Sequence, residues 1–309
     1  MKFKLLVSSF TILSFAAAFA QTPKDSSGYF IDSSKAIVKS VLHEDIKPGS
    51  ELTWYKMITN VPHDISTYPA AAFSADKIPL FAALTAGTGA LMLFDEPGWH
   101  ANRRLFDNSP VFHSLSNFGV SLGEAQYHFA LAGAFAVLGL VDHNQRALKT
   151  ASNIVEVVIA SGISVQLLKR VFGRESPAAA TEYAGNWKFF PNLIEYQKHQ
   201  PKYYAYPSGH ITTLTATVTV IANNFPEEKW IKPVGYSLIV LTGIGLVSRG
   251  MHWYSDLPMG FFLGYTFGNI IAPLQNNSHE QGTEADKLKL NLSPLLGFNN
   301  IGMRLSFNF

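Results

Sequence analysis

The chain has 309 residues, of which 47% are hydrophobic and only 15% carry a charge. This composition allows a sizeable folded core and argues against intrinsic disorder. The formal net charge is +2 and the chain has no cysteine. We therefore expect no nucleic-acid partner, and a disulfide framework, a cysteine zinc site and a thiol nucleophile are excluded.

The first twenty residues have the pattern of an export signal. Lys2 and Lys4 form a short basic region, an apolar run follows from Leu5 to Phe15, and Ala18 and Ala20 fit the small-residue rule for cleavage. The alternative is an uncleaved anchor helix, but the run is short for a membrane span. We expect residues 1–20 to be a signal peptide. The mature protein would then lie in the cell envelope, either in the periplasm or associated with a membrane.

The middle of the chain contains six apolar segments whose length suits helices. Residues 21–75 precede them as a polar lead-in with several prolines. The segments lack the alternation of strands, and breakers such as residues 95–98 separate them. They are Ile78–Phe94, Phe129–Val141, Ile154–Leu168, Ile211–Ile221, Val234–Val247 and Leu257–Ile271.

The C-terminal residues have a different pattern. From Ile301 to Phe309 apolar and polar residues alternate, Leu288 to Leu292 do the same, and residues 297–300 supply a turn. Period two predicts strands, so we expect a short β-hairpin over residues 286–309. A closing strand of an outer-membrane barrel is the alternative, but two strands cannot close a barrel.

The segments leave membrane insertion open. Several are as apolar as a membrane span but shorter than the usual ~20 residues. Glu156 and Gln166 interrupt the third segment. Two arrangements fit: a compact or peripherally membrane-bound bundle, which we favour, and an integral membrane protein.

Three short motifs place polar groups at the edges of these segments. In the last motif His252 and Asp256 are four residues apart, so a helical turn would bring the carboxylate to the imidazole and make it more basic. Arg249 would share that face and could bind the group under attack. An aromatic-anchored turn with an ordinary ion pair is the alternative.

The other two motifs carry groups suited to an anion. Ser208 is a natural N-cap, Gly209 allows close backbone approach, and His210 could protonate a leaving oxygen. Lys169 and Arg174 follow the third apolar segment. Taken alone, the second motif could be a plain helix start and the first a favourable placement of cations at a helix C-terminus.

The order of the three motifs resembles the type 2 phosphatidic acid phosphatase superfamily. The resemblance covers about residues 130–274. It implies an all-α fold, a bundle of about six core helices with the site at one end, and we expect this catalytic domain at residues 76–275.

The resemblance also implies roles for eight residues. His252 would be the nucleophile that forms a phosphohistidine, Asp256 would orient it, and His210 would be the general acid. The phosphate-binding residues would be Lys169, Arg174, Ser208, Gly209 and Arg249. The implied activity is hydrolysis of a phosphomonoester or a lipid phosphate or diphosphate, with no metal and no cofactor. Substrate identity and oligomeric state stay open.

Two departures from the family pattern keep other functions open. The arginine that ends the family's first motif is replaced by Ser176, and Leu246 occupies the ungapped position of the arginine in the third. A vanadate-dependent haloperoxidase-like enzyme and a degenerate, non-catalytic envelope protein are the alternatives.

The segment 183–206, between the first two motifs, is rich in aromatic residues. It would form either an apolar lip over the site, suited to a lipid tail, or loop side chains packed on the bundle.

Overall fold

The computed structural model describes residues 54–273, 289–297 and 300–308, and the last two ranges by their backbone only. The predicted signal peptide and most of the lead-in lie outside the described residues. The chain divides into two units, the first ending at Leu274 and the second running from Gln275 to Phe309.

The described residues of the first unit form helices and connecting loops, which confirms the predicted all-α class. Five of the six predicted apolar segments lie within a helix, namely α8, α9, α11, α12 and α13, and the first begins with α5 and ends two residues after it. The elements of this unit are α3 (Lys56–Thr59), α4 (Val61–Ala72), α5 (Ile78–Met92), α6 (Asp95–Asn108), α7 (Pro110–Ser121), α8 (Ala125–Val141), α9 (Gln145–Phe172), η1 (Pro177–Ala179), α10 (Leu193–Lys198), η2 (Gln200–Lys202), α11 (Gly209–Asn224), α12 (Ile231–Ser248), η3 (Tyr254–Asp256) and α13 (Leu257–Ile271).

The second unit contains two strands, β1 (Lys289–Gly297) and β2 (Asn300–Asn308). They pair antiparallel, with Lys289 opposite Asn308 and Gly297 opposite Asn300.

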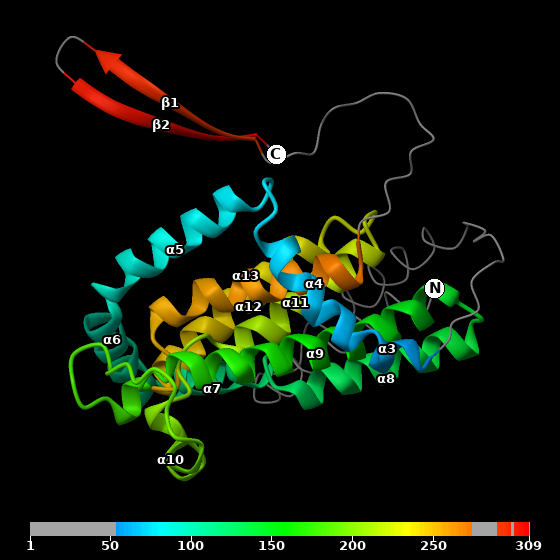
Figure 1. The fold of residues 1–309 in the computed structure, drawn as a ribbon, viewed down its shortest axis with the longest axis horizontal. Coiled ribbons are helices and arrows are strands. Elements are labelled where there is room, and N and C mark those ends of the chain that lie inside the picture. The colour runs from blue at the N-terminus through cyan, green and yellow to red at the C-terminus, as the bar shows by residue number, and fades with distance from the viewer. Residues whose placement is uncertain (1–53, 274–288, 298–299, 309) are drawn as a thin grey trace, which may run out of the picture. The chain divides into compact units, whose positions relative to one another are not determined.

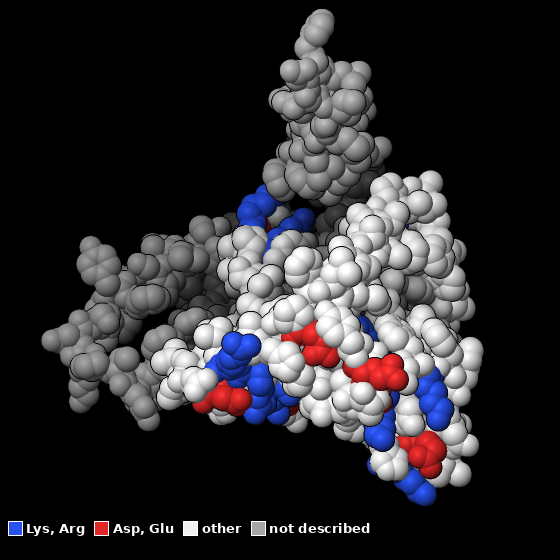
Figure 2. All heavy atoms as spheres, turned by 90° about the vertical axis from the view of Figure 1, so that its left-hand side faces the viewer, with Lys and Arg blue, Asp and Glu red and all other residues white. Residues whose placement is uncertain are grey.

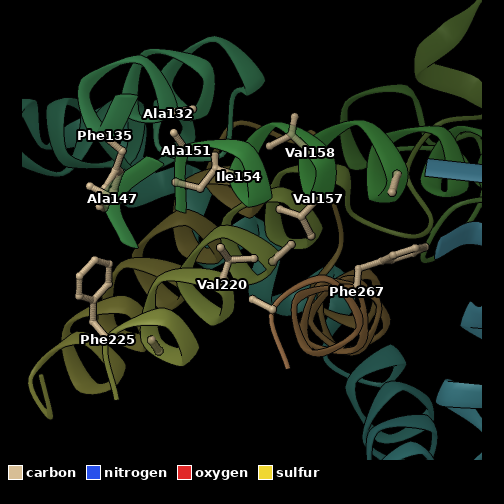
Figure 3. Packing of buried hydrophobic residues seen from close by; sticks show 14 of the residues in the cluster. Ala132, Phe135, Ala147, Ala151, Ile154, Val157, Val158, Val220, Phe225 and Phe267 are labelled. Atoms are coloured by element: carbon tan, nitrogen blue, oxygen red, sulfur yellow. The ribbon is translucent and has the colours of Figure 1, made fainter. Parts of the chain in front are cut away.

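Helix α11 is the centre of the first unit. It packs against α13, α9 and α12, which lie side by side in Figure 1. Aliphatic and aromatic side chains from α8, α9, α11 and α13 fill the space between these helices (Figure 3). They include Phe135, Ile154, Val220 and Phe267. This packing fixes the two ends of α11, and its N-terminal end carries Ser208, Gly209 and His210.

Glycines let α13 approach α11 closely. Gly260, Gly264 and Gly268 are four residues apart, so they share one face of α13. A Cβ at Gly260 would lie 2.6 Å from the carbonyl oxygen of Ser208, which is too close for any side chain. Small residues on α13 therefore set the position of the Ser208 backbone.

The sequence predicts a breaker at residues 95–98, but these residues form the first turn of α6, and the chain bends just before them, at Leu93 and Phe94. Helices α5 and α6 meet at 71°. A new helix nevertheless begins at Asp95, with Pro97 in its first turn, where a missing N–H costs little because that N–H has no partner within the helix. Helix α6 therefore starts with a carboxylate that points back into the molecule, where it is fully buried.

Candidate active site

The end of α9 places the first motif. The helix ends at Gly173, whose φ of 55° is left-handed, and a Cβ there would collide with the carbonyl oxygen of Lys188. Lys169 is buried on the last turn of the helix. Because the chain turns at Gly173, Arg174 points into the protein instead of continuing along the helix.

Arg174 is fully buried and held by protein groups. Its Nη2 donates to Asp95 Oδ2 and to the Ala184 carbonyl oxygen, each at 2.8 Å, and its Nη1 donates to Ser255 Oγ at 2.6 Å and to an oxygen of Asp256. Both terminal nitrogens are therefore occupied. The sequence indicates a phosphate-binding role for Arg174, but these contacts give the guanidinium a structural role next to Asp256.

The imidazole of His252 is fixed by a backbone carbonyl. Its Nδ1 lies 2.6 Å from the carbonyl oxygen of Ala205, which can only accept, so Nδ1 carries the proton. The other nitrogen, Nε2, is buried and has no hydrogen-bond partner among the described residues. In a neutral ring Nε2 therefore holds the free lone pair.

Asp256 lies beside His252 but not in the expected hydrogen bond. Its Oδ2 is 3.7 Å from Nδ1 of His252 and accepts instead from the backbone N–H of Trp253 at 2.7 Å. The reason is local: residues 254–256 form a 3-10 turn, so His252 and Asp256 are not on consecutive turns of one α-helix. The carboxylate can still stabilise a positive imidazole through space.

The second histidine faces the first. The ring centroids of His210 and His252 are 6.3 Å apart. Burial, followed by the charges of His252, Lys169, Arg249 and His128, lowers the pKa of His210 to about 3. Burial is also the main cause that lowers the pKa of His252. Both rings are therefore neutral near pH 7 when the site is empty.

Ser208, Gly209 and Lys169 lie together beside these rings and form a candidate anion site. Ser208 occupies the N-cap of α11, yet its hydroxyl makes no capping bond and is buried without a partner among the described residues. A Cβ at Gly209 would lie 3.8 Å from Nζ of Lys169. A free hydroxyl, a helix N-terminus and an ammonium thus surround a space that a larger residue than glycine would fill.

Arg249 lies at the rim. It is the exposed C-cap of α12, and the left-handed Gly250, at φ 68°, then turns the chain away from the helix. The two residues after Arg249 therefore do not continue the helical face that the spacing predicts. Its charge nevertheless reaches the site, since it lowers the pKa values of His210 and Tyr204.

The sequence profile of the PAP2 superfamily matches residues 150–280. This part of the chain belongs to the PAP2 superfamily. All three motifs of the PAP2 region lie inside the matched range. The residues that the resemblance brings together at one site, His210, His252 and Asp256 among them, are neighbours in the structure.

A search of curated proteins gives no match. A solved structure that resembles the chain is the first transmembrane PAP2 type phosphatidylglycerolphosphate phosphatase from Bacillus subtilis. It is 16% identical and has a TM-score of 0.39, and the match covers 70% of this chain and 94% of that one.

The structure adds site residues that the motifs do not contain. Asp95, outside the matched PAP2 range, accepts from Ser255 N, Ser255 Oγ and Arg174. The Ala205 carbonyl sets the tautomer of His252, and the Tyr204 ring lies 6.0 Å from it. The carboxylate of Asp95 beside an apolar segment is only a weak indication of a site residue. Nothing in its position in the sequence relates it to the PAP2 motifs.

The aromatic segment before the second PAP2 motif divides between the two expected arrangements. Tyr196, Tyr203 and Tyr206 are buried, whereas Tyr183, Phe189 and Phe190 are exposed by 60% or more. Among the described residues, no group of three or more acidic or histidine side chains could hold a metal ion.

Two helices of the PAP2 region, α9 and α12, are long and apolar enough to cross a membrane, and up to four spans result if the bent pairs α5–α6 and α7–α8 each count as one. On the face drawn in Figure 2, most charged side chains gather in the lower half and broad described areas carry no charge. Large apolar side chains such as Val137, Leu140, Leu167 and Val240 are exposed. These features favour membrane association.

A methyl group at Gly209 tests whether an anion binds beside Lys169 and Ser208. We expect Gly209→Ala to fold, because the new Cβ meets its neighbours at ordinary contact distances of 3.5 Å and more. The methyl would occupy the space beside Lys169, so inorganic phosphate should bind about tenfold or more weakly. Gly87→Ala, where a Cβ meets nothing within 4 Å, is the matched control. Equal phosphate affinity in both variants would show that no anion binds beside Lys169, Ser208 and Gly209.

Proposed function

We propose that this protein is a metal-independent phosphatase that hydrolyses phosphomonoesters or lipid phosphates and diphosphates through a phosphohistidine on His252. One observation carries the proposal. The buried Nε2 of His252 has a free lone pair and no hydrogen-bond partner among the described residues, and it lies beside the candidate anion site of Lys169, Ser208 and Gly209. A nucleophile next to an anion site is what phosphoryl transfer requires.

The first step is attack on phosphorus. The phosphoryl oxygens bind to Lys169, to the Ser208 hydroxyl and at the N-terminus of α11, and Nε2 of His252 forms the P–N bond as the bond to the leaving oxygen breaks. The imidazole becomes positive, and the Asp256 carboxylate 3.7 Å from Nδ1 stabilises that charge.

The second step returns the enzyme to its starting state. In the first step His210 has given its proton to the leaving oxygen and become neutral; in the second it takes a proton from the water that attacks the phosphohistidine. The P–N bond breaks, phosphate leaves, and His252 is neutral again. Arg174 holds the Asp256 carboxylate in place throughout, because it donates to it from a fully buried position.

His210 must gain a proton for this cycle, and the substrate is the natural cause. With the site empty, the pKa of His210 is about 3, lowered by burial and by the positive groups around it. A bound phosphoryl group brings negative charge next to the ring, which raises that pKa. Binding is therefore coupled to uptake of a proton.

This coupling predicts an acidic pH dependence. For an alkyl phosphomonoester, kcat/KM should rise as the pH falls from about 8 to about 5, because the free enzyme must gain a proton on His210. Burial lowers the pKa of His252, which extends its neutral, nucleophilic form toward lower pH. The His210→Ala variant should lose this additional slope and retain only the titration of the substrate. Identical profiles for both proteins would contradict the role of His210.

The activity itself is tested with purified protein. Incubation with p-nitrophenyl phosphate and with a panel of lipid phosphates, in the presence of a chelator, should release phosphate. No release from any substrate would overturn the proposal. Release that disappears with the chelator would overturn the metal-independent mechanism.

We also propose that the protein acts at a membrane of the cell envelope. The apolar length of α9 and α12 and the exposed apolar side chains support this location. Cell fractionation followed by carbonate and detergent extraction decides it: the protein should stay with membranes in carbonate and dissolve in detergent.

A further inference from the structure

The first motif lacks the arginine that the family resemblance leads one to expect at position 176. Ser176 stands there and is fully buried, and its hydroxyl makes no hydrogen bond of standard geometry among the described residues. Arg174 cannot replace the missing arginine, because both of its terminal nitrogens are bound to protein groups. The candidate anion site therefore contains one cation fewer than the family pattern. A different donor is needed on the side of Ser176.

Tyr204 occupies the space next to Ser176. Its ring centroid lies 6.0 Å from that of His252, at an interplanar angle of 77°, and Nζ of Lys169 lies 5.2 Å from the same ring. Its backbone forms a parallel bridge with Arg174, which fixes it beside the first motif. The residue is only half-buried, so a ligand can reach it.

The phenol of Tyr204 interacts with several groups of the site. Burial raises the pKa of the Tyr204 phenol, the Ser176 hydroxyl and the charge of Arg249 lower it, and the charge of Asp256 raises it. Because the net shift is upward, the phenol keeps its proton at neutral pH and can donate a hydrogen bond. The phenol is therefore a neutral donor whose ring lies against His252 and Lys169, the two residues that the proposed mechanism places at the phosphoryl group.

We propose that the Tyr204 hydroxyl, with Ser176 beside it, binds a phosphoryl oxygen of the substrate in place of the missing arginine. The proposal rests on the proposed phosphatase function and names a further substrate-binding residue for it. A neutral donor pair replaces a charged fork, so geometry rather than charge provides the binding on this side. The ring also holds the Lys169 ammonium by a cation–π contact.

Tyr204→Phe separates the hydroxyl from the ring. The variant keeps the contact with Lys169 and should unfold at the wild-type temperature. Its kcat/KM for p-nitrophenyl phosphate should fall by about ten- to hundredfold, and inorganic phosphate should inhibit it more weakly by a similar factor, since a hydrogen bond to a charged group is lost. Tyr203→Phe is the matched control: this neighbour is buried against Tyr196, and its kinetics should not change.

Two outcomes would overturn the proposal while leaving the phosphatase function intact. One is a Tyr204→Phe protein with wild-type kcat/KM and wild-type inhibition by phosphate. The other is a loss in Tyr204→Leu that Tyr204→Phe does not share, which would mean that only the ring matters, through Lys169. The wild-type assay is read first, so an inactive wild-type protein would count against the proposed function and not against Tyr204 alone.

Discussion

Replacing His252 with alanine is expected to abolish turnover and to prevent any trapped phosphoenzyme. The reason is that Nε2 carries the free lone pair beside the candidate anion site, because the Ala205 carbonyl keeps the proton on the other ring nitrogen. Acid quenching after incubation with a radioactive phosphate substrate measures the phosphoenzyme. Wild-type protein should carry label, and the His252→Ala protein should carry none.

The His210→Ala variant gives the contrast that identifies each role. A good leaving group needs little protonation, so this variant should still form the phosphoenzyme from p-nitrophenyl phosphate. Turnover of alkyl phosphates should fall by about a hundredfold or more. Label on the His252→Ala protein, or mild and equal losses in both variants, would contradict the assignment of nucleophile and acid.

The parts of the fold that could be predicted are those with a local signal. Each of the six apolar segments is long and predominantly apolar, and each lies in a helix, apart from the last two residues of the first segment. Helices α6 and α7 gave a weaker signal, because Pro97 and Pro110 resemble breakers in a sequence. Both prolines lie in the first turn of a helix, where Ser109 caps α7 by accepting from Phe112 N.

The site could be predicted only where one motif contains the whole interaction. The nearness of His210, His252 and Asp256 follows from the motif order, and the structure brings them together. The partner of His252 Nδ1 could not be predicted, because it is the backbone carbonyl of Ala205, and a backbone carbonyl has no residue type to recognise. For Arg174 the sequence indicates a phosphate contact. Its two carboxylate partners are 79 and 82 residues away in the chain, so the sequence could not reveal them.

Asp95 is the residue whose effect on the folded protein should be largest. Its two oxygens accept three hydrogen bonds, from Ser255 N at 3.0 Å, Ser255 Oγ at 2.6 Å and Arg174 Nη2 at 2.8 Å, and all three residues are fully buried. Asp95→Asn would turn an amide N–H₂ toward donors and leave the buried guanidinium with a single carboxylate. Removing one partner of a buried ion pair costs about 3 to 5 kcal/mol of unfolding free energy.

The matched control is an exposed pair of the same type. Asp107 lies 2.8 Å from Arg103 on the surface of α6, and Asp107→Asn should change the unfolding free energy by about 1 kcal/mol or less. Thermal unfolding of both purified variants measures the difference. Asp95 acts on Asp256 only through Arg174 and Ser255. When kinetics are measured below the unfolding temperature of the variant, Asp95→Asn should therefore lower kcat while KM changes little. Equal stability of the two variants would mean that Arg174 does not depend on Asp95. Arg174 and the backbone N–H of Trp253 would then hold Asp256 in place without help from Asp95.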